Sequence, residues 1–187
     1  MDSNKIHDRG VVAKSNRLGG IRVGLGVCGG IGSVEVVKII REIRRHGASV
    51  DAFITRSVEN FITPLSIEWA SERPVVKEST ARVEYLDAFD AVVVAPLTLN
   101  TLSKAAVGIC DNPVTLLIAG QIGRHGPLLF VPTMNQSLFE HPSFIAHRRC
   151  LEQWGARFMD CPLEESRLKM PAPERFVTEI ESIVGRG

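Results

Sequence analysis

The alternation of short apolar runs with longer amphipathic segments constrains the fold more than any other feature of the sequence. The run AVVVA at residues 91–95 is nearly all β-branched, which is typical of a central parallel strand that is covered on both faces. Further strands are predicted at 21–27, 48–54, 127–131 and 156–160, and helices at 31–46, 58–71, 99–109, 113–120, 136–153 and 173–184. This pattern predicts a doubly wound α/β fold, Rossmann-like or flavodoxin-like, with a mostly parallel sheet and helices on both faces.

Length and charge narrow the organisation of the chain and its partners. The 187 residues suit one domain, which we expect over residues 20–187, after a polar, aperiodic and flexible tail at residues 1–19. The 22 basic and 21 acidic residues leave a net charge of +1, so nucleic acid is not an expected partner. No apolar run approaches the roughly 20 residues of a membrane span, and the four cysteines lack metal-ligand spacing. We therefore expect a cytoplasmic protein without a metal or a membrane partner.

A glycine-rich stretch, GVCGGIGS at residues 26–33, follows the first predicted strand and opens the first helix. Gly24, Gly26 and Gly29 have the spacing G-x-G-x-x-G of dinucleotide-binding loops. Dinucleotide sites also place an acidic residue at the end of the second strand to hold a ribose, but here that strand ends in Ile54 and Thr55. The glycine spacing alone therefore does not predict a dinucleotide site.

Hydroxyl groups stand where the ribose-binding acid is missing. Thr55 and Ser57 could bind a phosphate monoester together with the backbone amides of Gly29, Gly30 and Ile31 at a helix N-terminus, which favours a mononucleotide such as FMN. Alternatively, the glycines allow a helix and a strand to pack closely, and the two hydroxyl residues cap the next helix. Both interpretations stay open at this point.

Two more polar loops follow the third and fourth predicted strands, PLTLNT at residues 96–101 and PTMN at residues 132–135. They place polar side chains at the same edge of the sheet, those of Thr98, Asn100, Thr101, Thr133 and Asn135, with Leu99 interleaved. Each loop alone is more typical of a helix cap, but four polar loops that converge on one edge indicate a ligand site.

Four segments, taken in order, resemble a known family. They are GVCGGIGS, TRSVENFITP, DAVVVAPLTLNTLSKAAVGICDN and PLLFVPTMNQSLFEHP, within about residues 21–175. They resemble the FMN-binding flavoprotein family of phosphopantothenoylcysteine decarboxylases and lantibiotic peptidyl-cysteine decarboxylases, with APLTLNT similar to its P-A-S-A-N-T loop and PTMN to its P-x-M-N substrate clamp. The resemblance implies that FMN contacts Gly29, Gly30, Ile31, Thr55, Ser57, Thr98, Leu99, Asn100, Thr101 and Thr133. It also implies that Asn135 meets the substrate carboxylate and that the chain forms a homo-oligomer, a trimer or a multiple of it such as a dodecamer.

Two departures from the family bear on the reaction. Its decarboxylases carry an acid–base histidine at or beside the position of Arg82 in this chain. A guanidinium stays charged and is no general base, although it could bind an anionic substrate or an anionic reduced flavin. The segment FMDCPLEESRLKMPAP lacks the A-C-G pattern of the family's cysteine-containing flap, so Cys161 is not assigned that role. His125 and His141 are interpreted as surface residues, and no catalytic residue is assigned.

These departures leave three functions open. We expect flavin-dependent reduction or electron transfer, in which an electron donor and a small-molecule substrate are the partners, because that chemistry resides mainly in the cofactor. The alternative enzyme is an FMN-dependent decarboxylase of a cysteinyl substrate, of the phosphopantothenoylcysteine or peptidyl-cysteine type. The third is a regulatory flavoprotein that binds FMN without turnover.

Overall fold

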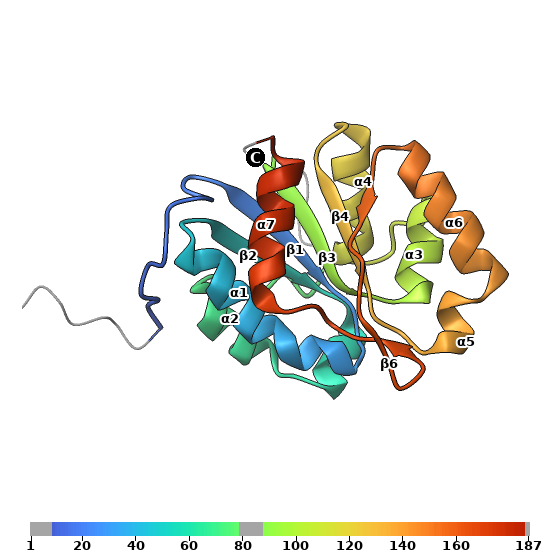
Figure 1. Ribbon diagram of the computed structural model, residues 1–187, viewed down its shortest axis with the longest axis horizontal. Coiled ribbons are helices and arrows are strands. Elements are labelled where there is room, and N and C mark those ends of the chain that lie inside the picture. Colours follow the sequence, from blue (N-terminus) through green and yellow to red (C-terminus); the bar gives the residue numbers. More distant parts are fainter. Residues whose placement is uncertain (1–8, 79–87, 186–187) are drawn as a thin grey trace, which may run out of the picture.

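The computed structural model describes residues 9–78 and 88–185, and these form a sheet with helices packed on both of its faces (Figure 1). The sheet contains β1 (Arg22–Val27), β2 (Ser49–Ile54), β3 (Ala91–Leu97), β4 (Leu128–Pro132) and β5 (Arg157–Phe158). All neighbouring strands are parallel, and their order across the sheet is β2-β1-β3-β4-β5. The predicted doubly wound, parallel α/β fold is confirmed.

The strand order reverses between β1 and β3. At such a point the loops after two neighbouring strands turn toward opposite faces of the sheet and leave a crevice at its carboxyl edge. Here those loops follow Val27 and Leu97, and the amide of Cys28 donates a hydrogen bond of 3.3 Å to the carbonyl of Pro96, which follows a cis peptide bond. The topology therefore brings the glycine-rich stretch and PLTLNT to the same crevice.

Two hydrophobic cores lie on the two faces of the sheet. One face is covered by α1 (Val36–Arg45), α2 (Pro64–Ser71) and α7 (Pro173–Ile183), and the other by α3 (Leu99–Ala106), α4 (Pro113–Gly123) and α6 (Pro142–Gln153) (Figure 1). Successive residues of β3 alternate between the cores, so Val93 packs in the first and Val92 in the second.

Gly24 and Gly26 serve the second of these cores. A Cβ at Gly26 would lie 2.9 Å from Cγ1 of Val114 on α4, and a Cβ at Gly24 would lie 3.1 Å from the ring of Phe89. The first two glycines of the G-x-G-x-x-G spacing therefore allow α4 and Phe89 to pack closely on β1, and neither is needed to explain a ligand site.

Prolines divide two of the predicted helices. The helix predicted at 58–71 is a 3-10 helix, η2 (Arg56–Asn60), followed by α2, whose first residue is Pro64. The helix predicted at 136–153 is α5 (Gln136–Phe139) followed by α6, whose first residue is Pro142. Proline is favoured in the first turn of a helix and disfavoured inside one, so each new helix begins at its proline.

Two segments differ from the sequence-based expectation. Residues 9–19 were expected to belong to a flexible tail, but they contact the C-terminal end of α1. The amide of Lys14 donates to the carbonyl of Arg45, and the amide of Leu18 donates to the carbonyl of His46. The side chain of Leu18 is fully buried. A hairpin of β6 (Leu163–Glu164) and β7 (Arg167–Leu168) lies between β5 and α7, where no strands were predicted.

Candidate functional site

The loop after β1 is held by a short chain of hydrogen bonds to the loop after β2. The amide of Gly29 donates to Oγ1 of Thr55 at 3.1 Å, and that hydroxyl lies 3.1 Å from Oγ of Ser57. A Cβ at Gly29 would lie 2.2 Å from this Oγ and 2.6 Å from the backbone carbon of Ser57, so glycine is required here. Thr55 thus joins the two loops, and Ser57 stays exposed beside them.

Backbone amides open the helix that follows. The 3-10 helix η1 (Ile31–Glu35) leads into α1, and its first hydrogen bond runs from the amide of Ser33 to the carbonyl of Gly30 at 2.9 Å. The amides of Ile31 and Gly32 precede that bond, so they have no partner within the helix. No atom lies within 4 Å of a Cβ placed at Gly30, which leaves space for a ligand beside these amides.

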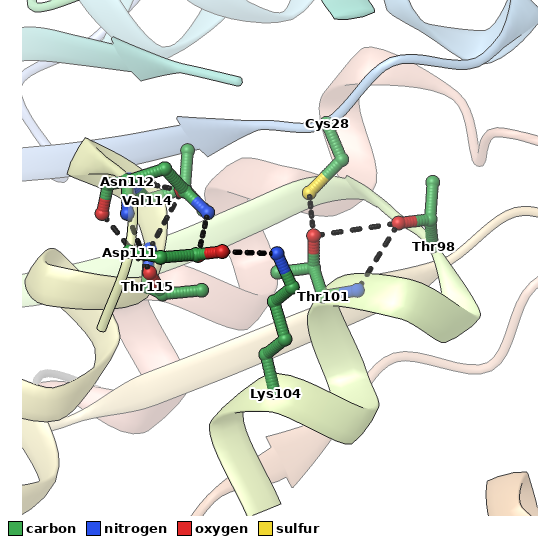
Figure 2. Close-up of polar contacts among 8 residues, drawn as sticks. All are labelled: Cys28, Thr98, Thr101, Lys104, Asp111, Asn112, Val114 and Thr115. Carbon is green, nitrogen blue, oxygen red and sulfur yellow. Dashed lines mark hydrogen bonds and ion pairs between the residues drawn. The ribbon is translucent and has the colours of Figure 1, made fainter. Parts of the chain in front are cut away.

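The crevice wall opposite this loop is the PLTLNT loop, which is tied to β1 by side chains (Figure 2). Oγ1 of Thr98 accepts from the amide of Thr101 at 3.4 Å and so caps α3, and the buried thiol of Cys28 donates to Oγ1 of Thr101 at 3.2 Å. Burial raises the pKa of Cys28, so the thiol is held as a protonated donor. The Thr101 hydroxyl is thus used to join the two loops, whereas Asn100 is exposed and Leu99 packs against the second core.

The GICDN segment supports this wall from behind. Oδ2 of Asp111 accepts from Nζ of Lys104 at 2.5 Å, and its other oxygen accepts from the amide group of Asn112 at 2.8 Å (Figure 2). The Lys104 hydrogen bond lowers the pKa of Asp111. Asn112 and Thr115 form a reciprocal capping box at the start of α4. This segment fixes the end of α3 relative to the start of α4.

A cavity of about 460 Å³ lies between the glycine loop, the loop after β4 and the β6–β7 hairpin. It collects three of the predicted site residues, which are Ile31, Thr133 and Asn135. Sequence reasoning missed the hairpin and the segment after it, whose residues also line the cavity: Pro162, Glu164, Arg167, Leu168, Lys169, Met170, Pro171, Ala172 and Pro173. The other predicted contacts lie outside this cavity, along the crevice between the loops after β1, β2 and β3.

Two buried hydroxyls have no hydrogen-bond partner among the described residues, and one of them belongs to Thr133, which lines the cavity. They are Oγ of Ser33 and Oγ1 of Thr133. A Cβ at Gly32 would lie 3.3 Å from that oxygen of Thr133, 3.4 Å from Met170 and 3.5 Å from Pro96, so four chain segments pack closely here. Buried hydroxyls without a partner are costly, and a bound polar ligand would satisfy them. Together with the open amides of the glycine loop, they fit a phosphorylated, hydroxyl-rich group such as FMN.

The remaining candidates lie elsewhere. Arg82 falls outside the described residues, so its relation to the cavity is a prediction. His141 caps α6, where its Nδ1 accepts from the amide of Ser143 at 3.1 Å, and His125 has a positive φ of 54° in the turn after α4. Cys161 is half-buried, which raises its pKa to about 12 and leaves it a poor nucleophile.

The described residues, 9–78 and 88–185, contain neither a cluster of metal ligands nor a membrane-spanning helix. No three histidine, cysteine or acidic side chains in this part of the chain are grouped to hold a metal ion. The helices in the same residues are too short or too polar to cross a membrane.

Comparison with known proteins places the chain in a family. The fold and the crevice define a flavodoxin-like α/β protein with a glycine loop at the point where its strand order reverses. A model of the Flavoprotein family matches residues 11–185, so the chain belongs to this family. The predicted resemblance is confirmed, and with it the expectation of a flavin. FMN is the form named for a solved structure with the same fold, the FMN-binding protein AtHal3. Its TM-score is 0.72 at 22% identity, with 87% of this chain and 95% of AtHal3 covered.

Curated relatives are longer than this chain. The coenzyme A biosynthesis bifunctional protein CoaBC of Thermococcus kodakarensis is 34% identical over 174 residues, which cover 89% of this chain and 43% of that protein. This chain therefore spans less than half the length of that relative. Among solved structures, MrsD from a Bacillus species has a TM-score of 0.77 at 19% identity, with 88% of this chain and 96% of MrsD covered. A PPC decarboxylase variant complexed with pantothenoylaminoethenethiol has a TM-score of 0.75 at 22% identity, with 87% and 97% covered.

Proposed function

We propose that this chain is an FMN-dependent decarboxylase of a substrate that ends in a cysteinyl residue. The observation that carries the proposal is the position of Asn135 in a cavity next to the glycine loop, in a member of the Flavoprotein family. The names of the relatives favour this reaction over the reduction that the sequence first suggested, because they are decarboxylases or CoaBC proteins. Arg82 is the feature of this chain that argues for reduction, and the test below separates the two reactions.

Different residues of the chain would bind the cofactor and the substrate. The amides of Ile31 and Gly32, with the Ser57 hydroxyl, would hold the phosphate of FMN, and Thr133 would donate to a polar group of the cofactor. Bound FMN supplies an acceptor for two electrons. Asn135 would donate its carboxamide hydrogens to the substrate carboxylate and so orient it before it is lost.

The proposed reaction is an oxidation as well as a decarboxylation. The cysteinyl residue loses its carboxyl group as carbon dioxide, a carbon–carbon double bond forms, and the product is an ene-thiol. One proton and two electrons leave the substrate for the flavin, which balances the step. The electrons then return to the ene-thiol and reduce it to a thiol, or they pass to an external acceptor.

The test is a single anaerobic turnover of the FMN-loaded protein. Phosphopantothenoylcysteine and a peptide that ends in cysteine would be mixed with it, and carbon dioxide, flavin absorbance and product mass would be measured. If the ene-thiol is released, we expect three results together. Carbon dioxide forms, the flavin bleaches, and the product has lost the elements of formic acid relative to the substrate. If the product has lost only carbon dioxide and the flavin does not stay bleached, the electrons have returned from the flavin to the ene-thiol.

Two results would decide against the proposal. Flavin reduction by a pyridine nucleotide or a low-potential donor, without carbon dioxide from either substrate, would support the reductase instead. Equal carbon dioxide release by the wild type and Asn135→Asp would remove the assigned role of this residue, since the new carboxylate would repel that of the substrate. Gln153→Glu is the control, because it makes the same change from an amide to a carboxylate at an exposed residue on α6 that lies outside the cavity.

We also propose that the working protein is a homo-oligomer, a trimer or a multiple of it. The crevice is formed at an edge of one sheet, and Ile31 and Val34 next to it are exposed hydrophobic residues. A second copy of the chain could cover them and enclose the flavin ring. Light scattering of the FMN-loaded protein would test this, and a flavin-saturated monomer would contradict it.

A further inference from the structure

The β6–β7 hairpin is joined to the loop after β4 by backbone hydrogen bonds. The amide of Gln136 donates to the carbonyl of Ser166 at 2.9 Å, and the amide of Leu168 donates to the carbonyl of Met134 at 2.8 Å. These bonds flank an antiparallel bridge between Asn135 and Arg167. In this arrangement the two bridged residues exchange no hydrogen bond themselves, and their side chains are at the closest spacing and on the same face. The backbone therefore holds the Arg167 side chain next to that of Asn135.

Both residues line the cavity, and both side chains carry donors that no other described residue accepts. The carboxamide of Asn135 caps no helix, and neither side chain makes a hydrogen bond or ion pair with another described residue. Glu164 is the register partner of Arg167 within the hairpin and also lines the cavity, but no ion pair joins the two.

The other charges around the cavity are already paired. Glu35 lies 3.0 Å from Nζ of Lys38, and Nζ of Lys169 lies 3.0 Å from Oε2 of Glu165. Among the described residues, Arg167 is thus the cavity-lining cation that makes no ion pair, although it is close enough to Glu165 to help lower the pKa of that carboxyl group. A guanidinium presents parallel N–H groups that match the two oxygens of a carboxylate or a phosphate.

We infer that Arg167 determines substrate specificity by binding an oxyanion of the substrate beside Asn135. The inference rests on the proposed function, because it concerns the substrate of the same site. The oxyanion is the carboxylate of the cysteinyl residue, which Asn135 also binds, or a phosphate ester at the other end of the substrate, which reaches Arg167 when the substrate folds back over the cavity. A guanidinium can bind either group through two parallel hydrogen bonds.

The test compares ligands that differ by one anionic group. Phosphopantothenoylcysteine, pantothenoylcysteine, phosphopantothenoylcysteamine and pantothenoylcysteamine would be titrated into the FMN-loaded wild type, Arg167→Gln and Arg167→Lys. Calorimetry under anaerobic conditions, on protein whose FMN has first been reduced with dithionite, would report binding without turnover, because a reduced flavin cannot accept the electrons of the substrate. Peptides that end in cysteine, as the free acid and as the amide, form a second series. Arg149→Gln is the matched control, because Arg149 is exposed on α6, has no partner and lies outside the cavity.

The expected result is a loss of affinity that depends on one anion. Arg167→Gln should bind the ligand with that anion about 10-fold to 100-fold more weakly, as expected when a charged hydrogen bond is removed, and should bind its neutral counterpart unchanged. Arg167→Lys should lose less affinity for that ligand than Arg167→Gln, and Arg149→Gln should bind it as tightly as the wild type. Dependence on the phosphate assigns Arg167 to that group, and dependence on the carboxylate assigns it to the cysteinyl end.

The outcomes separate this inference from the proposed reaction. Equal affinity of the wild type and Arg167→Gln for every compound overturns the inference, and so does a failure of both to bind any of them. Arg167-dependent binding without carbon dioxide release leaves the oxyanion site in place and overturns the decarboxylase. FMN affinity should be the same in all variants, which shows that the hairpin change has not disturbed the cofactor site.

Discussion

Replacing Gly29 with alanine tests the geometry of the glycine loop most directly. The added methyl group would lie 2.2 Å from Oγ of Ser57, 2.5 Å from its Cβ and 2.6 Å from its backbone carbon. Rotation of the Ser57 side chain would relieve only the first contact, so the two loops must separate by about 0.8 Å to bring the backbone contact from 2.6 Å to 3.4 Å. The hydrogen bond from the Gly29 amide to Thr55, now 3.1 Å, would lengthen beyond useful range.

The cost of this change can be estimated. Overpacking in a closely packed region costs about 1–3 kcal/mol, and a domain of this size loses about 2–4 °C of Tm for each kcal/mol. We expect Gly29→Ala to lower the Tm of the flavin-free protein by about 2–12 °C. FMN affinity should fall in addition, because the shifted loop no longer presents its amides in the same geometry.

Gly30→Ala is the matched control for this measurement. A Cβ at Gly30 meets no atom within 4 Å, and its φ of −179° is extended backbone that alanine adopts without strain. Thermal unfolding of the two flavin-free variants, followed by FMN titration with fluorescence quenching, gives both quantities. Equal Tm values for Gly29→Ala and Gly30→Ala would refute the assigned contact between the loops after β1 and β2.

Three further predictions follow from buried polar groups and thiols. Thr133→Val should keep or raise the Tm of the flavin-free protein, since Oγ1 has no partner to lose, but should weaken FMN binding; unchanged affinity in titration would contradict a cofactor contact. Glu42→Gln should cost about 2 kcal/mol in urea unfolding at pH 7, as expected for hydrogen bonds to a charged group. Burial acts to raise the pKa of Glu42, but hydrogen bonds from Lys14, Arg45 and His46 lower it overall, so this difference should be present above the ordinary pKa of a glutamate and shrink as the pH falls through the lowered value. A difference that stays constant into strong acid would contradict this. Iodoacetamide at pH 8 should modify exposed Cys110 well before buried Cys28, whose pKa is raised by burial, and peptide mass spectrometry that finds equal rates would contradict this burial.

The sequence predicted the sheet well because each strand carries a local signal. Buried parallel strands such as β3 are continuous apolar runs, and the helices between them show an amphipathic period. The loops after these strands then meet at one edge by topology alone, so the glycine loop and PTMN could be placed together. Membership of the Flavoprotein family could be predicted because the motifs occur in these loops.

The parts that sequence reasoning missed depend on contacts between distant residues. β6 and β7 have two residues each, too few to show an alternating pattern, and their pairing with Asn135 joins residues 32 positions apart. Leu18 was read as part of a flexible tail because its neighbours are polar, yet its side chain is buried in the first core. The role of Gly24 and Gly26 in packing likewise becomes visible only when α4 is in place.

The chemistry of decarboxylation favours the phosphate as the group that Arg167 binds, which requires the substrate to fold back so that its phosphate lies near the carboxylate that Asn135 orients. A guanidinium on the reacting carboxylate would stabilise a negative charge that disappears as carbon dioxide forms, so it would bind the ground state more tightly than the transition state and would lower kcat. A phosphate keeps its charge throughout the reaction, and binding it lowers KM without that cost. Asn135, which is neutral, can orient the carboxylate with a smaller penalty. If Arg167 binds the phosphate, Arg167→Gln should therefore raise KM for phosphopantothenoylcysteine and leave kcat unchanged, whereas a rise in kcat would place the guanidinium on the reacting carboxylate.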